Sequence, residues 1–307
     1  MWKVLSGVFM GWSLGANDSA NIFGTAVTTG TVKYGTAISV TAVFVFMGSV
    51  LEGSKCMTTV SELSRLVPID AFCCTLATAI TMTTLTYLAI PASTSQGIIG
   101  AVIGAGILSG SADFSKLYKI VSCWVLTPVS GIIAAYFLHR LLGYVLDRTI
   151  TSITYRSLLY SFGIVTAGSY GAYSLGCNNV ANVTGVYVGP GILSAETASV
   201  IGGLSIAIGV LTYSEKVMMT VGKEIAPLDP FSALVTVLAT ASTLHIFTQI
   251  GVPVSSSQAV VGAVVGVGIV GDIRTVSAKM LAKIGLGWLL TPVSAGVLAW
   301  VLIRWIT

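Results

Sequence analysis

The amino-acid sequence predicts an all-α polytopic membrane protein made of two homologous repeats. Three observations predict it: the composition, a series of long apolar runs, and four motifs that each occur twice. Of the 307 residues, 54% are hydrophobic and 8% are charged, and the mean hydropathy is +0.92. Soluble domains carry roughly a quarter charged residues. An ordinary soluble core is therefore excluded.

The apolar runs have the length of bilayer spans, which is about 17–25 residues. They lie near residues 4–29, 35–51, 71–90, 117–146, 158–176, 197–212, 231–250 and 279–303. The first run begins at the N-terminus, and no cleavage site of small residues precedes a soluble domain. We therefore expect a multi-pass protein without a cleaved signal peptide.

Four motifs recur in the same order, and each second copy follows its first at a nearly constant offset, just over half the length of the chain. Residues 15–30 match 176–191, 90–110 match 252–272, 124–131 match 288–295, and 55–60 have a weaker echo in 216–221. The sequence thus predicts an N-terminal membrane repeat (1–150) and a C-terminal membrane repeat (151–307), joined by the polar segment 147–157. Such repeats are typical of secondary transporters, which bind substrate between the halves near the midplane. A structural repeat without transport is the alternative.

The first repeated motif, residues 15–30, places Asn17, Asp18 and Asn21 inside an apolar span. If the segment is helical, a spacing of three and four residues brings these side chains to neighbouring faces. Its glycines permit a break in the helix, which at membrane depth is tolerated beside a cavity. The second copy holds amides at the equivalent positions: Asn178, Asn179 and Asn182. Interhelical hydrogen bonding is the structural alternative, and a lone Asp suits it poorly.

The second repeated motif consists of two hydroxyl runs, 91–96 and 253–258, which we call the first and second hydroxyl runs. Each begins with a proline, and a proline followed by hydroxyl residues is typical of the first turn of a helix. Such a helix end binds anions through its free N–H groups. The candidate substrate ligands are Ser93, Thr94, Ser95, Gln96, Ser255, Ser256, Ser257 and Gln258, together with Asn17, Asn21, Asn178, Asn179 and Asn182. Ordinary serine-capped helices are the alternative.

The neutral donors of these motifs suit a tetrahedral oxyanion, and the oxygens of Asp18, Asn21 and Asn182 suit a small cation. Moving one charge against the membrane potential costs about 2.3 kcal/mol per 100 mV, so a dianion that enters a negative cell needs twice that. Co-transported Na⁺ or H⁺ can offset this cost. We expect Asp18 to bind the cation, as a Na⁺ site if Na⁺ is coupled, and we expect no other cofactor.

Other classes of function fit the sequence less well. The basic residues are spread over short loops, so no nucleic-acid partner is expected. The five cysteines show no CxxC spacing and are expected to serve packing. His139 and His245 stand alone outside the repeated motifs, and Asp18 is the one acid convincingly within a span, so we do not expect an enzyme. A passive anion channel is a further alternative.

The motifs resemble those of the inorganic phosphate transporter (PiT) family. Its G-x-N-D-x-x-N signature is met by Gly15, Asn17, Asp18 and Asn21, and its P-x-S-[ST]-[ST]-H stretch is similar to the hydroxyl runs. The resemblance spans both halves. It implies cation-coupled phosphate uptake across the cell membrane, inverted repeats, re-entrant hairpins that carry the hydroxyl runs at the midplane, and a homodimer.

Two departures from the family pattern bear on the substrate. Asn179 stands where the family usually has Asp, and Gln96 and Gln258 stand where it usually has His. A carboxylate can accept the proton of phosphate, whereas sulfate has none and suits neutral donors. Asp18 therefore favours phosphate, and Asn179 keeps the family's sulfate-permease branch as the alternative.

The number of spans stays open. With residues 91–110 as a re-entrant hairpin each half has four full spans, and with a full span there it has five. The loop charges do not decide the orientation.

Overall fold

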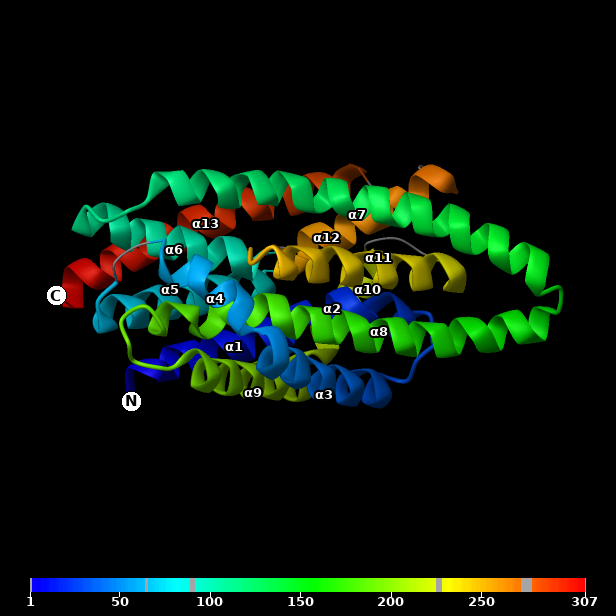
Figure 1. Cartoon of the computed structure of the whole chain (residues 1–307), viewed down its shortest axis with the longest axis horizontal. Helices are drawn as coiled ribbons and strands as arrows, with labels where there is room; N and C mark the ends of the chain where they lie inside the picture. The colour runs from blue at the N-terminus through cyan, green and yellow to red at the C-terminus, as the bar shows by residue number, and fades with distance from the viewer. Residues whose placement is uncertain (1, 64–65, 89–91, 225–227, 272–277, 307) are drawn as a thin grey trace.

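The computed structural model describes residues 2–63, 66–88, 92–224, 228–271 and 278–306, and every regular element in these ranges is a helix. The first half contains η1 (Trp2–Val4), α1 (Leu5–Asp18), α2 (Ala20–Thr28), α3 (Tyr34–Glu52), α4 (Ser54–Ser61), α5 (Pro68–Tyr87), α6 (Thr94–Ser109) and α7 (Phe114–Thr149). The second half contains α8 (Ile153–Thr184), η2 (Gly185–Tyr187), α9 (Ala195–Tyr213), α10 (Glu215–Glu224), α11 (Pro230–Gln249), α12 (Ser256–Val270) and α13 (Ala278–Ile306). Figure 1 shows these helices packed into one elongated bundle.

The helices confirm the membrane class. In the described ranges, six of them are long and apolar enough to cross a bilayer: α3, α5, α7, α9, α11 and residues 281–306 of α13. The apolar helices α6 and α12 are shorter. With 16 residues, α6 is about 24 Å long, less than the roughly 30 Å of the hydrocarbon core. Its length fits the expected re-entrant segment better than a full span.

The order of helices repeats along the chain. Helices α3 and α9 have 19 residues each, and α5 and α11 have 20 residues each. The two members of each pair are separated in the chain by the same offset as the repeated motifs. The polar segment 147–157 that joins the two halves is mostly helical, and only residues 150–152 separate α7 from α8. Arg156 bridges this junction, since its guanidinium pairs with Asp147 at 2.9 Å and its Nε donates to the Ile150 carbonyl at 2.6 Å.

Each half packs its short apolar helix against a long helix of the other half, an arrangement that we call exchanged packing. The short helix α6 of the first half lies against α13 of the second, and α12 of the second half lies against α7 of the first (Figure 1). Both contacts are backbone-close, because a Cβ added at Gly100 would collide with the Pro292 carbonyl, and one at Gly262 with the Pro128 carbonyl. Each short helix is therefore held by the long helix of the other half.

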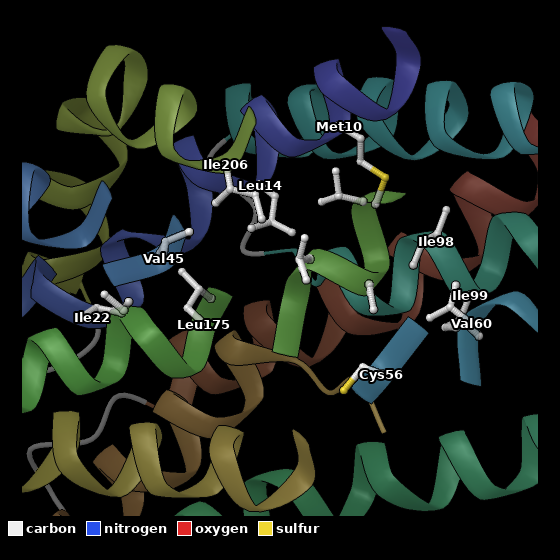
Figure 2. Packing of buried hydrophobic residues seen from close by; sticks show 14 of the residues in the cluster. Met10, Leu14, Ile22, Val45, Cys56, Val60, Ile98, Ile99, Leu175 and Ile206 are labelled. Atoms are coloured by element: carbon white, nitrogen blue, oxygen red, sulfur yellow. The ribbon is translucent and has the colours of Figure 1, made fainter. Parts of the chain in front are cut away.

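A buried apolar cluster supports the signature segments. Leu14 of α1, Val45 of α3, Leu175 of α8 and Ile206 of α9 are all fully buried and belong to one core cluster. Figure 2 shows these four side chains gathered at the crossing of their helices. Leu14 and Leu175 each precede the central residue of a signature by one helical turn, so the polar residues begin where this core ends.

Candidate functional site

The first signature contains the expected break. Helix α1 ends at Asp18, Ser19 forms a turn, and α2 begins at Ala20. Asp18 is 2% exposed, and its Oδ2 accepts a hydrogen bond of 2.8 Å from the Ser256 hydroxyl. The amide of Asn21 donates to the same hydroxyl at 3.1 Å. Asp18, Asn21 and Ser256 form a buried group that we call the carboxylate cluster.

The second signature forms a matching group without a charge, which we call the amide cluster: Asn179, Asn182 and Ser95. Helix α8 runs unbroken through both asparagines, and both are fully buried. Asn182 Nδ2 donates to Ser95 Oγ at 2.8 Å and to Asn179 Oδ1 at 3.0 Å. Each cluster thus joins the signature of one half to the hydroxyl run of the other.

The hydroxyl runs begin helices through serine caps. Ser93 precedes α6 and Ser255 precedes α12, and each hydroxyl accepts a hydrogen bond of 3.3 Å from a first-turn N–H. The expectation of a proline in the first turn was wrong for Pro253, which lies in the chain segment before the Ser255 cap. The serine hydroxyl already satisfies the free N–H group there, so the helix starts after it. Pro91 lies outside the described residues.

The N-termini of α6 and α12 lie close together. Ser95 in the first turn of α6 donates to the Val254 carbonyl at 2.8 Å, one residue before the cap of α12. Residues 254–256 therefore connect the two clusters, because Val254 binds Ser95 of the amide cluster and Ser256 belongs to the carboxylate cluster. Two helix ends with partial positive charge meet at this point.

Three of the candidate ligands point elsewhere. Asn17 donates to Thr86 at 2.7 Å. The amide of Asn178 donates to Thr248 at 3.0 Å and its oxygen accepts from the Val254 N–H at 2.8 Å. Ser257 pairs with the Ser255 hydroxyl at 2.9 Å. These side chains brace the helices around the clusters.

Several buried polar atoms around the clusters have no hydrogen-bond partner. In the described part of the chain they include the acceptors Asp18 Oδ1, Asn182 Oδ1, Gln96 Oε1 and Gln258 Oε1, the donor Asn179 Nδ2, and the hydroxyls of Ser19 and Thr94. An unpaired buried group costs about 1–3 kcal/mol, so such a concentration is typical of a ligand site. The acceptor oxygens suit a hard cation, and the N–H and O–H groups suit an anion.

Ser19 was missed by the sequence analysis. The signal was its position directly after Asp18, because the break in the helix leaves its hydroxyl fully buried beside the carboxylate cluster. No group of three His, Cys, Asp or Glu side chains within the described ranges could hold a metal ion. Any cation here would therefore be bound largely by amide, hydroxyl and carbonyl oxygens around one carboxylate.

Comparisons with known proteins agree with this architecture. Residues 14–299 match the model of a family described as the phosphate transporter family. A Pyrococcus furiosus protein, provisionally named a phosphate permease, is 28% identical over 98% of this chain and 94% of its own. The sulfate permease CysP of Bacillus subtilis is 29% identical over 94% of this chain and 83% of its own.

One solved structure shares the fold. It is described as the sodium-dependent phosphate transporter, and it is 22% identical in sequence to this chain. The two structures superpose with a TM-score of 0.84, over 99% of this chain and 98% of the other.

Proposed function

Because the chain belongs to the phosphate transporter family, we propose that it is a symporter that takes up inorganic phosphate together with Na⁺. The family consists of transporters, and the part of the chain that the structure describes has six helices suited to cross a bilayer, so it is a multi-pass membrane transporter rather than an enzyme. The observation that carries the proposal is the set of unpaired polar atoms around Asp18 and Asn179. These atoms offer a cation and an oxyanion neighbouring binding positions.

Asp18 is proposed as the residue that binds the cation. Its Oδ2 is held by Ser256 at 2.8 Å, which leaves the buried Oδ1 unpaired. Asn182 Oδ1 and the side-chain oxygens of Gln96 and Gln258 are unpaired and buried as well. A single carboxylate with neutral oxygens gives a site of low charge, which suits a monovalent cation that must be released on the other side. Sodium is preferred over a proton because the structural neighbour is described as sodium-dependent.

The phosphate is proposed to bind at the meeting point of α6 and α12. The Asn179 amide and the Thr94 hydroxyl are buried donors without partners, and the two helix N-termini add partial positive charge. The bound cation neutralises the Asp18 carboxylate, which removes the repulsion that a dianion would otherwise meet in this low-dielectric region. Sulfate is the second candidate, because Asn179 supplies an amide where the family usually has a carboxylate, and a sulfate permease is among the relatives.

The larger architecture belongs to the same proposal. Residues 1–150 and 151–307 are two inverted repeats that hold the site between them, and the protein works as a homodimer in the cell membrane. The repeated helix order and the exchanged packing of α6 and α12 support the two repeats. An inverted pair of repeats would alternate access to one central site from either side of the bilayer.

Uptake into proteoliposomes tests the proposal. Labelled phosphate and labelled sulfate are offered separately under an inward Na⁺ gradient, under a pH gradient, and under neither, with protein-free liposomes as the control. We expect accumulation of phosphate that requires the Na⁺ gradient and is weakly inhibited by excess sulfate. Accumulation of sulfate alone would reassign the substrate, and accumulation that needs only the pH gradient would reassign the cation. Flux that is independent of both gradients would indicate a channel instead.

A further inference from the structure

A polar network surrounds the Glu52 carboxylate at the end of α3, outside the two clusters. Glu52 Oε1 accepts a hydrogen bond of 2.7 Å from the Tyr173 hydroxyl. Its Oε2 accepts from Lys55 Nζ at 2.8 Å and from Gln249 Nε2 at 2.6 Å, and His245 Nε2 lies 3.4 Å away. We call Glu52, Lys55, Tyr173, His245 and Gln249 the Glu52 network.

The Glu52 network ties the two halves together next to the second hydroxyl run. Glu52 and Lys55 belong to α3 and α4 of the first half, and the other three residues belong to α8 and α11 of the second. Gln249 ends α11, and the chain then leads through residues 250–255 into the run that holds Ser256. Thr59 of α4 donates to the Gly251 carbonyl at 2.5 Å within this lead-in. Movement of α4 away from α11 would therefore act on the position of the second run.

The repeat-equivalent contact has a different chemistry. At the offset of the repeated motifs, Lys216 on α10 corresponds to Lys55, and Tyr87 at the end of α5 corresponds to Gln249. There the Lys216 ammonium lies 6.0 Å from the Tyr87 ring centroid. Tyr213 occupies the position of Glu52, and its ring packs on Trp12 at a centroid distance of 5.4 Å. The carboxylate is thus present in one copy only.

The polar side chains beneath these contacts are also buried to different extents in the two copies. Asn178 and Thr248, beneath the Glu52 network, are fully buried. The equivalent pair in the other copy, Asn17 and Thr86, is half-buried, whereas Tyr87 and its equivalent Gln249 are both exposed. The layer beneath the Glu52 network is therefore packed more tightly than the equivalent layer of the other copy. In an inverted repeat, equivalent contacts lie toward opposite faces of the membrane.

We propose that Glu52 is a positioning residue that holds one access path to the substrate site shut. Transport then requires the Glu52 network to separate while the equivalent layer around Asn17 and Thr86 packs more tightly. The proposal rests on the proposed alternation between two inverted repeats. Glu52 is about 20% exposed and Lys55 about 43% exposed, so water can replace their bonds when the helices part. Such a network can form and break within each cycle.

Two native cysteines report on this path. Cys56 follows Lys55 in α4, and Cys177 lies one helical turn after Tyr173, to whose carbonyl its thiol donates at 3.0 Å. Both are fully buried, as are Cys73 and Cys74 on α5. Opening at Glu52 would expose Cys56 and Cys177 to a water-soluble maleimide. General loosening of the fold would expose the α5 cysteines too.

The test is site-by-site maleimide labelling of the full-length purified protein in detergent, without phosphate, with each thiol followed by mass spectrometry. Glu52→Gln should speed labelling of Cys56 and Cys177 about tenfold, the change given by roughly 1.4 kcal/mol of lost preference for the closed state. Cys73 and Cys74 should react as in the wild type. Glu62→Gln is the matched control, because it breaks a 2.8 Å ion pair with Lys116 outside the network.

Tyr173→Phe is a second variant that removes one hydrogen bond and keeps the ring, and it should give a smaller increase confined to the same two thiols. Wild-type labelling in both variants, or an equal increase at all of these thiols, would overturn the proposal. The measurement does not depend on which anion is transported. A wild-type protein that fails to take up phosphate would count against the proposed function and leave the labelling result interpretable.

Discussion

Replacing Ser256 with alanine tests the carboxylate cluster most directly. The Ser256 hydroxyl donates to Asp18 Oδ2 at 2.8 Å and accepts from Asn21 at 3.1 Å. All three residues are at most 8% exposed, so water cannot easily take the place of the hydroxyl. In Ser256→Ala both oxygens of Asp18 would lack a hydrogen-bond partner. The carboxylate would then be free to turn away from the cation.

The expected loss follows from the charge on Asp18. A hydrogen bond to a charged group contributes about 1.5–3 kcal/mol. At 1.4 kcal/mol per tenfold, Ser256→Ala should weaken Na⁺ binding, and phosphate binding through it, by roughly 10- to 150-fold. Ser257 is the matched control in the same run, because its hydroxyl pairs with Ser255 and not with a signature residue. Ser257→Ala removes a neutral pair worth about 0.5–1.5 kcal/mol and should have a smaller effect.

The assay is phosphate binding by isothermal titration calorimetry, at a series of Na⁺ concentrations, on wild type and both variants in detergent. Thermal unfolding establishes that each variant is folded. Ser256→Ala should shift the Na⁺ concentration required for half-maximal phosphate binding upward, and Ser257→Ala should leave it close to the wild-type value. Equal shifts in the two variants, or none in Ser256→Ala, would refute the role given to the Asp18–Ser256 contact.

Three further predictions follow from the same geometry. Asp18→Asn should abolish Na⁺-driven accumulation in proteoliposomes while the protein still folds; fully coupled uptake would remove Asp18 from the cation site. Asn179→Asp should preserve or improve phosphate uptake and weaken sulfate competition, whereas the opposite change in competition assays would identify a sulfate carrier. Gly100→Ala should destabilise the protein by about 1–3 kcal/mol through overpacking against the Pro292 carbonyl. Gly35→Ala, whose Cβ meets nothing within 4 Å, should not, and equal melting temperatures would contradict the packing argument.

The sequence predicted the helices and the polar motifs because both leave periodic or repeated patterns. It could not predict which asparagine of a signature faces the site. Asn17 and Asn21 are the same residue type one turn apart, yet one braces Thr86 and the other joins Ser256. That choice depends on the rotation of α1 and α2, which is set by tertiary packing and by the break at Ser19. Repeat comparison alone does not contain this information.

No pattern in the sequence predicts the Glu52 network. Its members are separated by up to 197 residues in the chain, and Tyr213 replaces Glu52 in the second copy. An isolated Glu at the end of a span is ordinarily read as a solvated helix end. Only the fold shows that Tyr173 and Gln249 converge on it. His245 stands alone in the sequence for the same reason, although its Nε2 lies 3.4 Å from Glu52 in the fold.

The exchanged packing of the halves has a consequence for how the protein is made. Asp18 and the hydroxyl of Ser256 are 238 residues apart in the chain. At about 5–20 residues per second, a ribosome needs roughly 12–48 s to synthesise the intervening chain. Until then Asp18 lacks the Ser256 hydroxyl, and α6 lacks its partner α13, which is synthesised later still. The buried polar group at Asp18 and the packing surface of α6 are therefore completed only when α12 and α13 have been synthesised, so the first half cannot reach its final packing by itself.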